Sequence, residues 1–107
     1  MLLQSRLLGV ELQHRHKLFH LFIRPSGAFE LHVDHCLRKR REHGPREPQY
    51  VWTNIELEWE EHHYIEARYW ASSGALVVTV NGDLLCQGEV PEYAADTHWL
   101  RVDEALG

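Results

Sequence analysis

The sequence predicts an all-β domain, mainly antiparallel, built as a small sandwich or barrel of about seven or eight short strands. Three observations predict this class. Apolar and polar residues alternate with a period of two, turn residues separate the alternating segments, and no segment carries an apolar stripe of helical spacing. The length of 107 residues fits a single domain covering residues 1–107. An open twisted sheet that pairs into a dimer is the alternative architecture.

The first half is expected to form strands joined by irregular turns. Arg24-Pro25-Ser26-Gly27 has turn chemistry, because proline fixes φ at the second position of a turn. No Gly or Pro lies between Gln13 and Leu18. The sequence therefore places no tight turn there, and one long bent strand is the alternative to two separate strands. The expected strands cover residues 7–14, 18–24 and 29–34, the last one half-buried.

The second half alternates most clearly, and it is expected to be rich in hairpins. Successive side chains of a strand point to opposite faces, so the apolar odd positions should face a core and the polar even positions water. A helix would scatter these apolar residues around its axis. Asn81-Gly82 suits a type I′ turn, which needs positive φ at both central residues. The expected strands cover residues 63–71, 75–81 and 84–90. The expected core set is Val51, Thr53, Ile55, Leu57, Trp59, Ile65, Ala67, Tyr69 and Ala71.

Charge divides the chain into two halves. Residues 1–50 carry nine Arg or Lys and five Asp or Glu. Residues 51–107 carry two Arg or Lys and eleven Asp or Glu. Either the halves pair across adjacent strands, which we favour, or the bipolar surface attracts a charged partner or a second copy. No apolar stretch approaches a membrane span, and residues 1–10 lack a signal-peptide layout. We expect a cytoplasmic protein in which Cys36 and Cys86 are buried thiols, with a disulfide as the alternative.

Aromatic and acidic residues share the outward phase of the second half. Trp52 and Trp70 fall on the even positions, together with Glu56 and Glu58, and Tyr50 and Tyr64 share this phase. Tryptophan is enriched at binding hot spots, and a row of carboxylates meets a basic partner. Stacking on sugar rings and burial under a second sheet are the competing interpretations of the aromatic residues.

Nine histidines are the compositional outlier. His14 and His16 would share one face of a strand, with His20 in phase, and imidazoles so placed suit a divalent transition metal. The spacing Gly9, His14-x-His16, His20, Gly27 resembles the first motif of the cupin superfamily. His20 stands where that motif has glutamate, the first gap is one residue short, and the second motif is absent. The resemblance implies a metal-binding, cupin-like protein or enzyme.

Residues 37–49 contain two prolines and one glycine and are expected to form a loop. Its run Arg38-Lys39-Arg40-Arg41 is a candidate phosphate contact, which would make nucleic-acid binding salt-dependent. The protein is acidic, with a net charge of −5, and no aromatic residue interleaves with the run. A solvated basic loop is the favoured interpretation.

The sequence thus predicts a non-catalytic, cofactor-free module that binds a macromolecule. A protein is the first choice of partner, and the module would act as an inhibitor or accessory subunit. A homodimer is one form of such binding. Metal binding through the three histidines ranks second, and nucleic-acid binding through the basic run ranks third.

Overall fold

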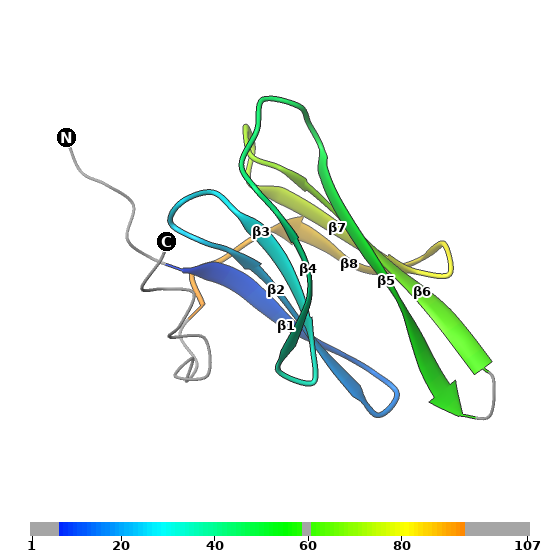
Figure 1. The fold of residues 1–107 in the computed structure, drawn as a ribbon. Helices are drawn as coiled ribbons and strands as arrows, with labels where there is room; N and C mark the ends of the chain where they lie inside the picture. The colour runs from blue at the N-terminus through cyan, green and yellow to red at the C-terminus, as the bar shows by residue number, and fades with distance from the viewer. Residues whose placement is uncertain (1–6, 59–60, 94–107) are drawn as a thin grey trace.

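The computed structural model describes residues 7–58 and 61–93, which form two four-stranded antiparallel sheets (Figure 1). Each sheet is a simple meander in which strands adjacent along the chain are hydrogen-bonded neighbours. The first sheet contains β1 (Leu8–His14), β2 (Lys17–Ile23), β3 (Phe29–Val33) and β4 (Cys36–Arg41). The second sheet contains β5 (Gln49–Glu58), β6 (Glu61–Trp70), β7 (Ala75–Val80) and β8 (Asp83–Glu89). The all-β, antiparallel prediction is confirmed, with a sandwich-like pair of sheets.

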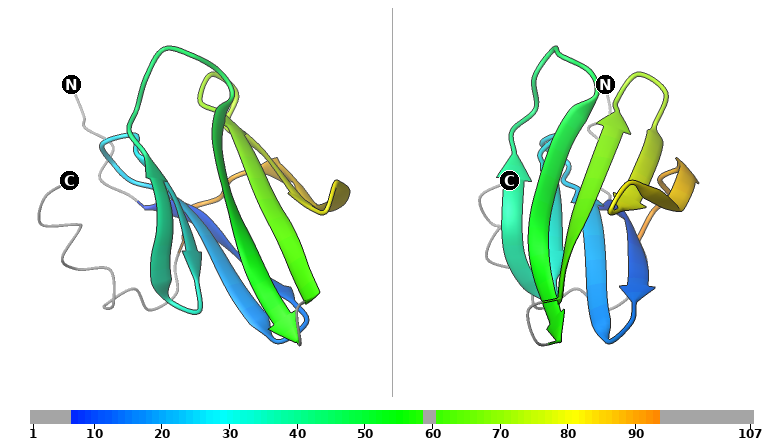
Figure 2. Two further views of the ribbon diagram at one scale, coloured as in Figure 1. Left: turned by 45° about the vertical axis from the view of Figure 1, so that its right-hand side comes forward. Right: turned by 90° about the vertical axis from the view of Figure 1, so that its right-hand side faces the viewer.

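The core lies between the two sheets. The views in Figure 2 show two layers, which approach each other most closely where β3 and β4 meet β5. Phe29 of the first sheet contacts Tyr69 of the second, with ring centroids 5.6 Å apart. One cluster of buried apolar side chains spans both sheets: Phe19, Leu21, Ile23, Phe29, Leu31 and Val33 from the first, and Val51, Ile55, Leu57, Ile65, Ala67, Tyr69, Leu76, Val78 and Val80 from the second.

The alternation predicted for the second half is confirmed in β5 and β6. Odd residues from Val51 to Leu57 are buried, while their even neighbours are exposed or half-buried. The same holds for Ile65, Ala67 and Tyr69 in β6. The expected burial of Ala71 was wrong: β6 ends at Trp70, and Ala71 is exposed in the following turn. Trp59 lies outside the described residues. The Asn81-Gly82 hairpin is also confirmed, with φ of 51° at Asn81 and 88° at Gly82.

The first half contains a hairpin between β1 and β2 that the sequence did not predict. β1 and β2 are joined at Arg15-His16, and Arg15 adopts a φ of 56° without being glycine. The neighbouring β3–β4 turn helps to hold this end of the sheet. Its Asp34 carboxylate accepts hydrogen bonds from the backbone N–H of Leu18 and from Lys17. The structure therefore has two strands here, and not one long bent strand.

The loop expected over residues 37–49 was wrong for its first part. Residues Cys36–Arg41 form β4, which pairs with β3 at the edge of the first sheet. Charged side chains are common on edge strands because they discourage pairing with other chains. The expected burial of Cys36 was also wrong. Cys36 is exposed, Cys86 is half-buried, and both are free thiols.

β3 differs from the half-buried strand that its alternation predicted. All five residues, Phe29–Val33, are buried, including Glu30 and His32 on the face turned away from the core. Tyr93 packs on this outer face, with its ring centroid 5.1 Å from that of Phe22. Segment 91–93 also runs beside β1, where Gly9 N–H donates to Pro91 O. The first sheet therefore buries residues on both of its faces.

Candidate binding surface

The outer face of the second sheet carries an exposed aromatic pair. Trp52 on β5 and Tyr64 on β6 point away from the core, as their even positions dictate. Their exposed fractions are 42% and 49%, and their ring centroids lie 6.1 Å apart at a tilt of 46°. Two large rings in contact on a polar face form an exposed apolar patch. Large exposed apolar patches that are rimmed by polar residues mark interaction surfaces.

A hollow of about 490 Å³ lies beside this pair, lined by Trp52, Tyr64, Glu66, Asn81 and Gly82. Its backbone is fixed by reciprocal hydrogen bonds. The Tyr64 N–H donates to Asn81 Oδ1, and the Asn81 N–H donates to Tyr64 O, both at 2.8 Å. Glu66 accepts a hydrogen bond from the hydroxyl of Tyr50. Burial, followed by this hydrogen bond, raises the pKa of Tyr50. We call this site the Trp52–Tyr64 hollow.

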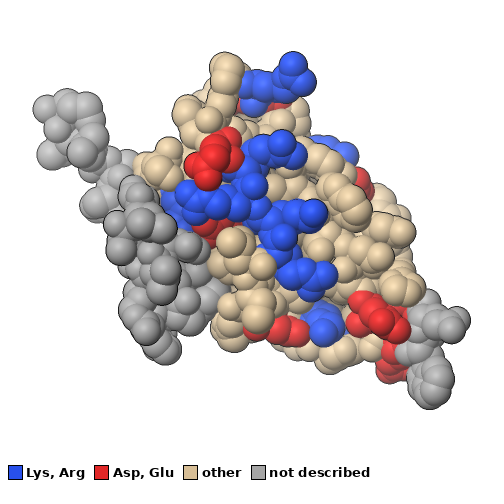
Figure 3. All heavy atoms as spheres, viewed as in Figure 1, with Lys and Arg blue, Asp and Glu red and all other residues tan. Residues whose placement is uncertain are grey.

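Cations of β4 lie along the edge of β5. Arg38 donates to Asn54 O at 3.0 Å, and Arg41 donates to Tyr50 O at 3.3 Å. Between them, Lys39 Nζ lies 5.5 Å from the ring centroid of Trp52. Figure 3 shows the resulting band of Lys and Arg across this side of the molecule. The basic run thus borders aromatic residues, which its own sequence neighbourhood does not contain.

Arg40 points to the other side of the first sheet. It forms ion pairs with the buried Glu30 carboxylate and with Glu42. Those two carboxylates raise the pKa of Arg40, with the hydrogen bond to Glu42 as the largest cause. Two carboxylates therefore balance the charge of Arg40 within the basic run.

The acidic row continues along β5 from the hollow. Glu56 and Glu58 are exposed, and Glu58 lies opposite Glu61 of β6 at the end of the hairpin. Arg15 pairs with Glu61 at 3.2 Å. The expectation that the two charge halves pair on adjacent strands was wrong, because each half forms a sheet of its own. Trp70 is half-buried in β6. It lies four residues beyond Glu66, which is opposite Trp52. At 3.3 Å per residue, this spacing corresponds to about 13 Å along the strand. The structure brings Trp52 together with Tyr64 and leaves Trp70 apart.

The three histidines of the cupin-like spacing are not brought together. The turn at residues 15–16 separates them: His14 ends β1, His16 lies in the turn and His20 lies on β2. His14 Nε2 contacts Nδ1 of His63 at 2.9 Å, whereas His20 Nε2 lies 3.2 Å from Glu11 on the outer face. No group of three or more His, Cys, Asp or Glu side chains suited to a metal ion occurs within residues 7–58 and 61–93.

A buried polar cluster on the outer face of the first sheet was missed by the sequence. Glu30 is completely buried and contacts Arg24 at 3.1 Å and His32 at 2.8 Å. Burial opposes ionisation of Glu30, but the hydrogen bond from His32 and the charge of Arg24 prevail and lower its pKa. For His20 the balance is different: burial disfavours the protonated ring and lowers its pKa, although the hydrogen bond with Glu11 acts in the opposite direction. Phe22, in phase with these polar residues, was the one sequence signal that this face is covered.

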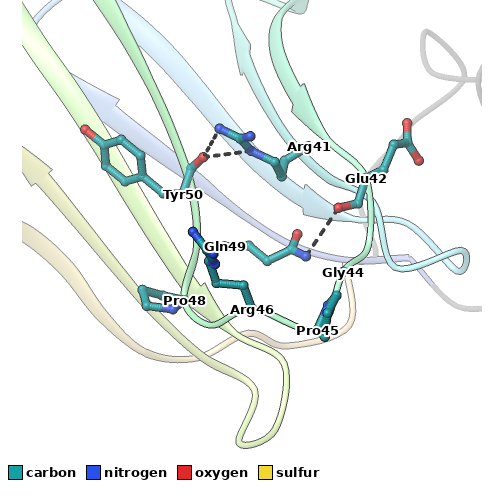
Figure 4. Close-up of a pocket in the computed structure, with 8 residues that line it drawn as sticks. All are labelled: Arg41, Glu42, Gly44, Pro45, Arg46, Pro48, Gln49 and Tyr50. Carbon is teal, nitrogen blue, oxygen red and sulfur yellow. Dashed lines mark hydrogen bonds between the residues drawn. The ribbon is translucent and has the colours of Figure 1, made fainter.

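A second cavity, of about 310 Å³, lies under the segment between the sheets (Figure 4). Its polar groups serve the loop itself. Gln49 Nε2 donates to Glu42 O at 3.3 Å, and Arg41 donates to Tyr50 O. The remaining lining comes from Gly44, Pro45, Arg46 and Pro48. These contacts attach residues 42–48 to β5, and they explain the cavity as part of the connection.

Comparison with protein-family models, with curated protein sequences and with solved structures finds no match to this chain. Within the described ranges there is also no helix with the length and hydrophobicity needed to cross a membrane.

Proposed function

We propose that this chain is a non-catalytic module that binds a protein partner through the Trp52–Tyr64 hollow on the outer face of the second sheet. The observation that carries the proposal is the exposed pair of rings beside a hollow whose backbone is fixed. Aromatic anchors at the centre of an interface contribute much of its binding energy, and a rigid site loses little entropy on binding.

The rest of the predicted site forms the surroundings of this centre. Glu56 and Glu58 continue the same face along β5 and act as its acidic rim. Rim charges mainly set association rate and salt dependence. Trp70 lies about four residues from the centre and contributes less than Tyr64, which takes its place in the proposed site.

Nucleic acid is the less favoured partner. Arg38 and Arg41 donate to carbonyl groups of β5, and Arg40 is paired with two carboxylates. Lys39 is thus the one member of the run that lies against an aromatic ring in the described structure. The surface beyond it, along β5, is acidic and would repel phosphates.

The test is quantitative capture of partners by the purified chain and by two variants, Trp52→Ala and Tyr64→Ala. Leu84→Ala is the matched control, because Leu84 is an exposed apolar residue of β8 on the same sheet. A protein partner should be captured by wild type and by L84A, and its affinity, remeasured with the purified partner, should fall about 30-fold in W52A.

Equal capture by all four proteins would contradict the proposal, as would binding only to nucleic acid. Analytical ultracentrifugation of the same variants tests whether the partner is a second copy of the chain. In that case, W52A and Y64A should shift a dimer to monomer while L84A does not.

A further inference from the structure

Resting on the proposed function, we infer that the partner contributes a basic, extended segment, with one lysine or arginine side chain seated in the Trp52–Tyr64 hollow. Two of the residues that line the hollow are aromatic and a third, Glu66, is a carboxylate. The faces of Trp and Tyr rings attract cations through their negative quadrupole. The Glu66 carboxylate accepts from the Tyr50 hydroxyl and lies 3.8 Å from Arg68, so it adds part of a negative charge to the hollow. The combination suits an ammonium or guanidinium group better than an anion.

Cations already lie on the rings of this sheet. Lys39 Nζ lies over Trp52, and the guanidinium carbon of Arg68 lies 4.8 Å from the ring centroid of Tyr50. These contacts show that the ring faces here are compatible with a nearby positive charge. The hollow lies between Trp52 and the Asn81-Gly82 turn, whereas Lys39 approaches from β4.

Charge complementarity extends the argument from one side chain to a segment. The strands of the second sheet contain six acidic residues and one basic residue, Arg68. The strands of the first sheet contain two acidic and five basic residues. Glu56 lies four residues from Trp52 on the same face, which corresponds to about 13 Å. An extended segment with two cations four residues apart would match the hollow and the acidic row together.

A neutral sugar is the competing occupant of two exposed rings. It would need the rings and the polar side chains but no charge on the ligand, so its binding would not depend on salt. A basic segment would bind more weakly as salt screens the carboxylates. The two occupants are therefore separated by ligand charge and by ionic strength.

The experiment titrates the isotopically labelled full chain with the peptide acetyl-Gly-Lys-Gly-Ser-Gly-Lys-Gly-amide and follows backbone and indole N–H resonances by NMR. The control peptide replaces both lysines with norleucine, which keeps the aliphatic stem and removes the charge. The lysine peptide should shift resonances of Trp52 and Tyr64, and the norleucine peptide should not. Trp52→Ala should weaken binding about 2-fold to 30-fold, the range for one cation–π contact.

A double variant, Glu56→Gln with Glu58→Gln, tests the second cation and should weaken binding while leaving thermal stability unchanged. The inference is overturned if both peptides bind alike, if neither binds, or if the shifts map to the first sheet. Protein capture that depends on Trp52 and Tyr64 despite such a result would leave the proposed function intact. Equal capture of the protein by wild type, W52A and Y64A would contradict the proposed function itself.

Discussion

The two sheets share one topology but treat their outer faces in opposite ways. On the first sheet the outer face buries Phe22, Glu30 and His32, under a covering that includes Tyr93. On the second sheet the outer face leaves Trp52 and Tyr64 exposed. Both faces occupy the polar phase of an alternating pattern, so the pattern alone does not distinguish them. The outer face of the first sheet is therefore covered, whereas that of the second sheet is open at these two rings.

The largest effect should come from truncating the aromatic residue of each outer face. Phe22→Ala removes a completely buried ring and should lower the free energy of unfolding by about 3–5 kcal/mol. Trp52→Ala removes an exposed ring and should cost less than about 1 kcal/mol. Urea unfolding of both variants measures the contrast. Equal losses would show that the second sheet's outer face is also structural.

The buried carboxylate provides the next contrast. Glu30→Gln leaves Arg24 and Arg40 beside an uncharged amide, and loss of one member of a buried ion pair should cost about 3 kcal/mol. Glu58→Gln, on the exposed acidic row, should change stability by less than about 0.5 kcal/mol. An unchanged urea midpoint for E30Q would show that the cluster adds no net stability.

Gly9 tests how closely the covered face is packed. A Cβ at this position would lie 2.6 Å from a ring carbon of Phe22 and 2.7 Å from the carbonyl oxygen of Leu21. Gly9→Ala should therefore cost about 1–3 kcal/mol. Gly44→Ala is the control, because its nearest atom would be 4.0 Å away. Thermal denaturation that does not separate G9A from G44A would contradict this close packing.

The smallest effect concerns pH. Burial lowers the pKa of His20 below its usual 6.5, so the folded chain favours the neutral ring. An unfolded chain binds the proton more readily, and stability due to this residue should fall as pH drops below about 6.5. Urea midpoints measured between about pH 7.5 and 5 should decline less for His20→Gln than for wild type.

A control variant, His16→Gln, removes an exposed histidine of the β1–β2 turn and should keep the wild-type decline. His14, whose pKa is also lowered by burial and by His63, should account for part of the remaining slope. If H20Q and H16Q behave alike, His20 does not contribute to the acid sensitivity.

The parts of the fold that could be predicted are those fixed by neighbouring residues. Asn81-Gly82 specifies its own turn, and the odd residues from Val51 to Leu57 specify one buried face. The Arg15-His16 turn could not be placed, because no residue there favours positive φ as glycine does. It is accompanied by contacts between neighbouring hairpins, such as Asp34 with Leu18, which join residues distant in sequence.

The sequence by itself determined strand periodicity, the Asn81-Gly82 hairpin and the outward direction of Trp52, because these follow from local backbone geometry and side-chain chemistry. The tertiary structure alone decided that residues 36–41 pair as a strand, that Glu30 and His32 are covered, and that Tyr64 and Lys39 adjoin Trp52. The reason is physical. A period of two sorts side chains onto two faces, but what packs against each face is set by contacts between segments far apart along the chain.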